Sequence, residues 1–119
     1  MVEDNEDNRA LVVKVLARKG FDVVEAVSGE EALELCEAAP PDLVLMDLEL
    51  AGMSGLEATR RLKGSARFRA VPVVALTAYA MVGDREKALE AGCDGYLSKP
   101  VDVRRLPEQI AEFLAGRRT

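Results

Sequence analysis

The 119-residue sequence contains no histidine and no tryptophan, and aromatic residues make up only 4% of it. Without histidine the chain supplies no imidazole base, no histidine metal ligand and no phosphohistidine, so any such chemistry has to come from a partner. Basic residues are also outnumbered, because 16 Lys and Arg stand against 21 Asp and Glu, for a net charge of −5. This acidic balance argues against a domain that grips nucleic acid by its phosphates, and we expect no nucleic-acid partner.

Cysteines and long apolar runs are scarce as well. Cys36 and Cys93 stand far apart without a CxxC pair, and we expect both to be buried structural thiols. No apolar run approaches the roughly 18 residues of a membrane span, and no signal peptide opens the sequence, so we expect a cytoplasmic protein without membrane contact. With 49% apolar residues, the chain should form one domain over residues 1–119 and leave no room for a second.

Five short apolar runs alternate with five helix-like stretches, which predicts an α/β fold of the (βα)₅ type with a doubly wound parallel sheet. The middle runs, LVLM and VPVVAL, are continuously apolar, as in parallel strands that helices cover on both faces. The expected strands are Met1–Val2, Phe21–Ala26, Leu43–Met46, Val71–Leu76 and Gly95–Leu97.

Helix boundaries are also marked in the sequence. Ser28 and Ser54 each precede a glutamate by three residues, a pattern typical of helix N-termini. Pro107 removes a backbone donor, so the last helix should begin near Leu106. The last two helices are expected within Asp84–Ala91 and Asp102–Leu114.

Polar residues follow the apolar runs at the point where each strand should end. In doubly wound sheets, ligands bind beyond the carboxyl ends of the strands, and these positions hold Glu3, Asp4, Asp47, Thr77 and Lys99. Converging carboxylates repel one another unless a cation lies among them, and oxygen ligands without histidine suit Mg²⁺. Asp47 follows the most apolar strand and can attack phosphorus to form an aspartyl phosphate. Lys99 and Thr77 can then bind an incoming anion.

The sequence resembles the receiver domains of two-component response regulators over nearly its whole length, and it is most similar to single-domain regulators and the receivers of hybrid sensor kinases. This resemblance implies a five-stranded sheet of order 2-1-3-4-5. It also implies a signalling switch that accepts a phosphoryl group on Asp47 in a Mg²⁺-dependent reaction. The segments that carry it are VEDN at 2–5, LVLMDLEL around Asp47, GMSGLE at 52–57, PVVALTAYAM at 72–81 and GCDGYLSKP at 92–100.

The resemblance also implies a metal site and a phosphate site. Glu3 and Asp4 would form the acidic pair that binds Mg²⁺, with Asp47 and the backbone carbonyl of Glu49 as further ligands. Lys99 would hold the phosphoryl oxygens.

Further residues would form the switch. The Thr77 hydroxyl would move toward the phosphate while Tyr96 changes rotamer, although from the residues alone Tyr96 reads as a half-buried strand aromatic. A cis peptide bond would precede Pro100. Phosphorylation would then alter the protein-binding face formed by the last strand and the two helices flanking it.

The same resemblance implies the partners. A sensor histidine kinase or a histidine phosphotransfer protein would donate the phosphoryl group, and a downstream effector protein would receive the signal. The domain would catalyse its own phosphoryl transfer and slow autodephosphorylation, but it would be a switch and not a turnover enzyme.

The sequence departs from the family pattern in places. Family members begin a few residues earlier, so the first strand looks truncated, and Ala51 replaces a common proline, which predicts a looser loop. Two alternatives stay open. A small aspartyl-phosphate phosphohydrolase would need aspartate in place of Glu49, and a phosphorylation-independent binding receiver is favoured by the short strand.

Overall fold

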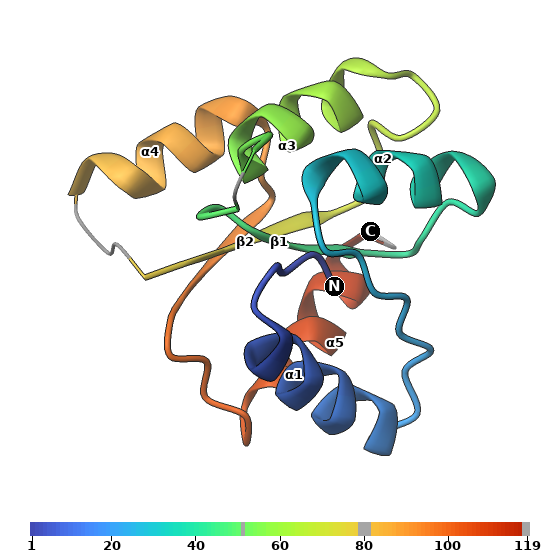
Figure 1. The fold of residues 1–119 in the computed structure, drawn as a ribbon, viewed down its shortest axis with the longest axis vertical. Helices are drawn as coiled ribbons and strands as arrows, with labels where there is room; N and C mark the ends of the chain where they lie inside the picture. The colour runs from blue at the N-terminus through green and yellow to red at the C-terminus, as the bar shows by residue number, and fades with distance from the viewer. Residues whose placement is uncertain (51, 79–81, 118–119) are drawn as a thin grey trace.

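The computed structural model describes residues 1–50, 52–78 and 82–117 as a parallel sheet between two layers of helices (Figure 1). The three strands are β1 (Val44–Asp47), β2 (Val73–Thr77) and β3 (Gly95–Ser98). The five helices are α1 (Glu6–Arg18), α2 (Gly29–Ala38), α3 (Gly55–Gly64), α4 (Val82–Ala91) and α5 (Leu106–Arg117).

The sheet has the strand order that the receiver resemblance implies. The strands β1, β2 and β3 are parallel neighbours in that order. On the other side of β1, Val2 forms one parallel bridge to Met46 and a second to Ala26. Counted along the chain, Val2 is the first strand position, Ala26 is the second, and β1, β2 and β3 are the third, fourth and fifth. Their order across the sheet is therefore 2-1-3-4-5, and the α/β prediction is confirmed.

The first two sheet positions are shorter than predicted. Val2 alone represents the strand predicted at Met1–Val2, and only Ala26 of the strand predicted at Phe21–Ala26 pairs with it. A strand forms only where its backbone can pair with a neighbouring strand. Val2 is the one residue of its segment that pairs on both sides, with Ala26 and with Met46. The segment 21–25 consequently runs beside the sheet without strand structure.

Helices cover both faces of the sheet (Figure 1). The helices α2, α3 and α4 pack on one face, and α1 and α5 pack on the other. Successive strand residues point to opposite faces, so Met46 and Val73 enter the core beneath the first layer. Leu45 and Val74 enter the core beneath the second, where they meet Leu106 of α5. Burial on both faces explains why the runs LVLM and VPVVAL are continuously apolar.

The predicted starts of α2, α3 and α5 are confirmed. Two other predicted bounds were wrong: α4 begins at Val82 and not at Asp84, and α5 continues past Leu114 to Arg117. The Ser28 hydroxyl accepts the Glu31 N–H at 3.1 Å and starts α2, and the Ser54 hydroxyl accepts the Glu57 N–H at 3.1 Å and starts α3. The helix α5 begins at Leu106, directly before the proline, as predicted.

The expectations about the thiols also hold, because Cys36 and Cys93 are free and buried. Burial raises the pKa of both thiols. Within the described residues, no helix has the length and apolar character that crossing a membrane requires.

Candidate functional site

The register of the sheet brings three predicted site residues to one edge. Asp47 is the last residue of β1, Thr77 is the last residue of β2, and Lys99 follows β3 directly. The Lys99 N–H donates to the Thr77 carbonyl at 2.8 Å, which extends the pairing of β2 and β3 by one step. Because all three strands are parallel, their carboxyl ends meet here, as the sequence predicted.

Asp47 is buried at the centre of this edge, with only 1% of its surface exposed. Its Oδ1 accepts hydrogen bonds from Lys99 Nζ at 2.8 Å and from the Glu49 N–H at 3.0 Å. Burial alone would raise the pKa of Asp47, but hydrogen bonds with Glu3, Lys99 and the Glu49 backbone outweigh it and lower the pKa. A carboxylate held in this way can act as a nucleophile.

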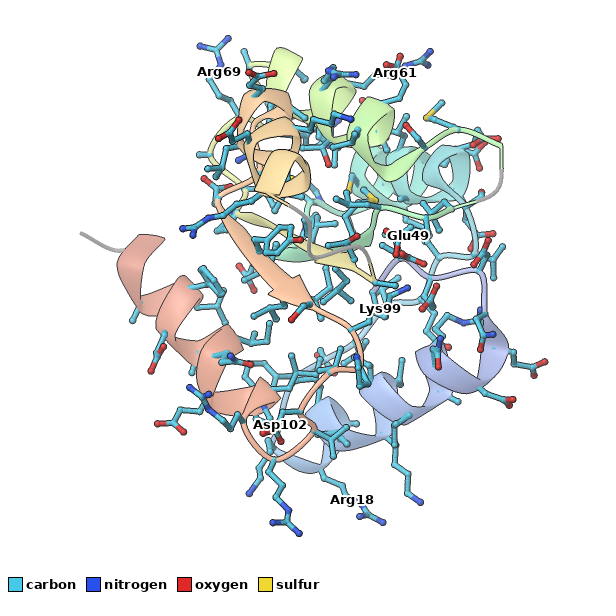
Figure 2. The ribbon with its side chains drawn as sticks, turned by 90° about the vertical axis from the view of Figure 1, so that its left-hand side faces the viewer. Arg18, Glu49, Arg61, Arg69, Lys99 and Asp102 are labelled. Atoms are coloured by element: carbon cyan, nitrogen blue, oxygen red, sulfur yellow. The ribbon has the colours of Figure 1, made fainter. Side chains whose placement is uncertain are left out.

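Lys99 is the cation of the site. Its Nζ lies 2.8 Å from Asp47 Oδ1 and 3.4 Å from Glu3 Oε1. Burial would lower the pKa of Lys99, but the hydrogen bond and the charge of Asp47 dominate and raise it. The ammonium group therefore stays protonated, and Figure 2 shows it reaching toward the same edge as Glu49.

Glu3 is the second buried carboxylate, with 1% of its surface exposed. Burial, followed by the hydrogen bond and the charge of Asp47, raises the pKa of Glu3 to about 7. At neutral pH the Glu3 carboxyl group therefore holds a proton for much of the time. A divalent cation bound among Glu3, Asp4 and Asp47 would favour the ionised form of Glu3 and would displace that proton.

Glu3, Asp4 and Asp47 form the predicted acidic cluster. Each offers one carboxylate oxygen, and these oxygens all lie within 4.8 Å of one another. Hard oxygen ligands, a raised pKa within the cluster and an exposed Asp4 that faces solvent all fit Mg²⁺. The Glu49 side chain is not part of this acidic cluster, because its Oε1 accepts the Ala78 N–H at 2.5 Å.

The residues expected to form the switch lie on the neighbouring strands β2 and β3. Thr77 is buried at the end of β2. Tyr96 is half-buried in β3, opposite Ala75, and packs against the core. This is the placement expected of a strand aromatic, and a rotamer change of Tyr96 stays a prediction. The peptide bond between Lys99 and Pro100 is cis, as predicted. Ala51, whose replacement of proline predicted a looser loop, lies outside the described residues.

One residue that supports the site was missed by the sequence analysis. Gly55 starts α3 with its backbone pressed against the end of β1. A Cβ at this position would overlap the carbonyl oxygen of Asp47 and lie 2.9 Å from Cα of Leu48. In the sequence, the one indication of this contact is the second glycine of GMSGLE, which by itself does not reveal that α3 packs this closely against β1.

Comparison with known proteins identifies the family. The sequence model of the response regulator receiver domain matches residues 1–111, and the chain belongs to this family. It is 44% identical over 114 residues to the polar-differentiation response regulator DivK of Brucella ovis. That alignment covers 96% of this chain and 93% of the relative.

Solved receiver structures agree. The receiver domain of a sensor histidine kinase from Pseudomonas aeruginosa is 35% identical, with a TM-score of 0.88, and covers 96% of this chain and 93% of that one. That structure has a magnesium ion coordinated in its active site cleft. A signal receiver domain of a histidine kinase from Syntrophus aciditrophicus is 29% identical, with a TM-score of 0.89, and covers 97% of this chain and 87% of that one.

Proposed function

We propose that this receiver domain takes a phosphoryl group onto Asp47 from a phosphohistidine of a partner protein, in a Mg²⁺-dependent reaction. Membership in the family establishes phosphorylation-controlled signalling in general and a switch in place of a turnover enzyme. The observation that carries the finer proposal is the buried Asp47, paired with Lys99 and next to two further carboxyl groups.

The transfer needs a nucleophile and a way to bring two anions together. An Asp47 carboxylate oxygen forms a bond to phosphorus while the phosphorus–nitrogen bond of the donor breaks, and the imidazole leaves with the electron pair. Lys99, 2.8 Å from Asp47 Oδ1, stays close to the phosphoryl oxygens. Glu3, Asp4 and Asp47, with the backbone carbonyl of Glu49, would hold Mg²⁺. When bound, this ion offsets the negative charge of the carboxylates and the phosphoryl group.

The output is proposed to pass through the end of β2 into β3. Lys99 contacts Asp47 through its side chain and Thr77 through its N–H, so a change at the phosphoacceptor reaches both strands. Thr77 would then move toward the phosphoryl group, and Tyr96 would change rotamer in step. A shift between two states would alter the face formed by α4, β3 and α5, to which a downstream effector protein binds.

The proposed donor is a sensor histidine kinase or a histidine phosphotransfer protein, because the chain itself has no histidine. The domain is proposed to catalyse this transfer and the slow hydrolysis of its own aspartyl phosphate. We place the protein in the cytoplasm, without nucleic-acid or membrane partners, in keeping with its net charge of −5.

Incubation with acetyl phosphate and Mg²⁺, followed by intact mass measurement, tests the proposal. We expect one acid-labile phosphoryl group on the wild type and none on the Asp47→Asn variant, which has nearly the same shape. Equal labelling of the variant would place the acceptor elsewhere. If the wild type is not labelled and also does not bind beryllofluoride, the protein is a phosphorylation-independent receiver. Sustained turnover of a phosphomonoester would instead indicate a phosphohydrolase.

A further inference from the structure

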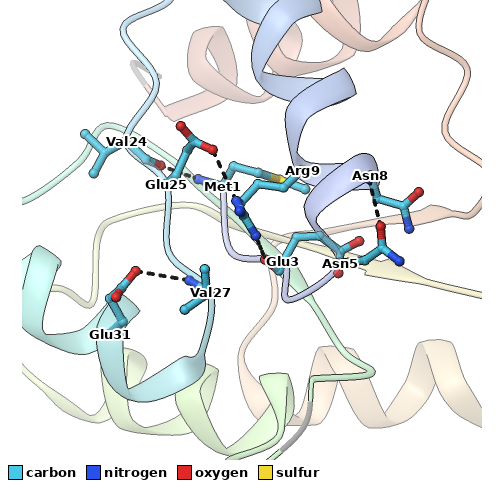
Figure 3. Close-up of polar contacts among 9 residues, drawn as sticks. All are labelled: Met1, Glu3, Asn5, Asn8, Arg9, Val24, Glu25, Val27 and Glu31. Carbon is cyan, nitrogen blue, oxygen red and sulfur yellow. Dashed lines mark hydrogen bonds and ion pairs between the residues drawn. The ribbon is translucent and has the colours of Figure 1, made fainter.

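Arg9 ties the acidic pair to a neighbouring segment of the chain. It lies in the first turns of α1, and its side chain is only 15% exposed. Its Nη1 donates to the Glu3 carbonyl at 2.9 Å, and its Nε donates to Glu25 Oε1 at 3.1 Å (Figure 3). A single guanidinium group thus joins the residue that carries a buried carboxylate to the segment that precedes α2.

Backbone hydrogen bonds of Met1 and Val2 fix the start of the segment that carries Glu3 and Asp4, because Val2 bonds to Leu45 and Asp47, and Met1 bonds to Val24 and Ala26. Val2 is its only residue in a β bridge, and α1 begins four residues later. The Glu3 N–H donates to the Ala26 carbonyl at 3.0 Å, and the Glu3 carbonyl accepts from Arg9. These two bonds hold the Glu3 backbone from both sides, and its side chain starts from that backbone.

We propose that Arg9 is a positioning residue that holds Glu3 and Asp4 in the arrangement that binds a divalent cation. This inference rests on the proposed function, because it concerns the metal site of the phosphoryl transfer. Arginine suits the task because its planar group presents several donors in a rigid fork, whereas lysine presents one compact ammonium. Partners that orient metal ligands commonly contribute about 10- to 100-fold to metal affinity.

Charge and geometry predict opposite signs for the loss of Arg9. Arg9 is a cation beside a cation site, so if only its charge mattered, its removal would strengthen Mg²⁺ binding. If it positions the ligands, its removal weakens binding although the site becomes more negative. The direction of the change therefore separates the two roles.

The experiment is a Mg²⁺ titration followed by ¹H–¹⁵N NMR, which also shows that each variant is folded. We expect Arg9→Gln to weaken Mg²⁺ binding by about tenfold. Arg9→Lys keeps the charge and loses the fork, so it should also weaken binding. The matched control is Arg67→Gln, because Arg67 bonds a carboxylate oxygen and a backbone carbonyl of Glu37 at 2.7 and 2.9 Å, on a separate part of the surface. Its Mg²⁺ affinity should equal that of the wild type.

A double-mutant cycle with Glu25 adds a second readout. Glu25 is half exposed and lies outside the acidic cluster, so Glu25→Gln should weaken Mg²⁺ binding only while Arg9 is present. A purely electrostatic effect of Glu25 would be the same in both backgrounds.

The outcomes separate this inference from the proposed function. If the wild type itself shows no Mg²⁺-dependent shifts, the proposed metal site is wrong. If the wild type binds Mg²⁺ and both folded Arg9 variants bind it equally well or more tightly, the positioning role is overturned. A loss of affinity in Arg67→Gln as large as that in Arg9→Gln would also overturn it, because it would then reflect general destabilisation.

Discussion

Replacing Gly55 by alanine should destabilise the protein and distort the phosphoacceptor loop. An ideal Cβ at this position would overlap the Asp47 carbonyl oxygen and lie 2.9 Å from Cα of Leu48, whereas ordinary contacts begin at 3.4 Å. Both obstacles are backbone atoms, so no side chain can rotate away. Overpacking of this kind costs up to about 3 kcal/mol, and the better helix propensity of alanine returns up to about 1 kcal/mol. We therefore expect a net loss of about 2 kcal/mol.

The matched control lies in the same helix. A Cβ on Gly64, at the other end of α3, meets nothing within 4 Å. Gly64→Ala should therefore stabilise the protein by about 0.5 to 1 kcal/mol. Urea unfolding followed by circular dichroism measures both changes, and with a slope of about 1 to 3 kcal/mol per molar urea the two midpoints should differ by about 1 M or more.

The same substitution, glycine to alanine, should lower the stability at Gly55 and raise it at Gly64, and this contrast tests the close approach of α3 to Asp47. A Gly55→Ala midpoint at or above that of the wild type would refute the argument. The folded variant should also respond less to acetyl phosphate, because the obstructed carbonyl belongs to the phosphoacceptor.

Three further predictions follow from the structure. Burial raises the pKa of Glu3 to about 7 from an ordinary 4.5, so the folded protein holds a proton that the unfolded chain releases in this window. The free energy of unfolding of the metal-free protein should then fall by up to about 3 kcal/mol as pH rises from about 4.5 to 7, and Glu3→Gln should remove that slope in urea titrations at several pH values. The Lys63 ammonium donates to the carbonyls of Arg69 and Val71 and to Asp94, so Lys63→Met should cost about 1 to 3 kcal/mol, and a thermal midpoint equal to that of the wild type would contradict this. Ser54→Ala removes the N-cap of α3 and should cost about 1 kcal/mol in urea unfolding, and an unchanged midpoint would show that the cap contributes nothing.

The fold was predictable from the sequence where the signals are local. Continuous apolar runs indicated β1 and β2, because strands covered on both faces need apolar residues at every position. Two serines marked the starts of α2 and α3, because a hydroxyl in that place satisfies a free helix N–H. The predicted strand at 21–26 was too long, because only Ala26 has a partner to pair with, and that partner is Val2.

The sequence predicted which residues form the site, but not which of them form ion pairs with one another. Asp47, Thr77 and Lys99 could be placed together because each follows an apolar run, and parallel strands end at one edge. Nothing in the order of residues showed that Lys99 would pair with both Asp47 and Glu3, because those atoms meet only through the packing of three separate segments.

The sequence by itself determined which chemical groups stand at the carboxyl edge of the sheet and, through the missing histidine, that this chain itself supplies no phosphohistidine. The alternation of apolar runs with helical patterns suffices for that, because it is a property of nearby residues. Only the tertiary structure decided the raised pKa of Glu3, the contact of Gly55 with Asp47 and the bonds of Arg9. Each of these depends on burial and on distances between groups that are remote along the chain, and folding alone sets those quantities.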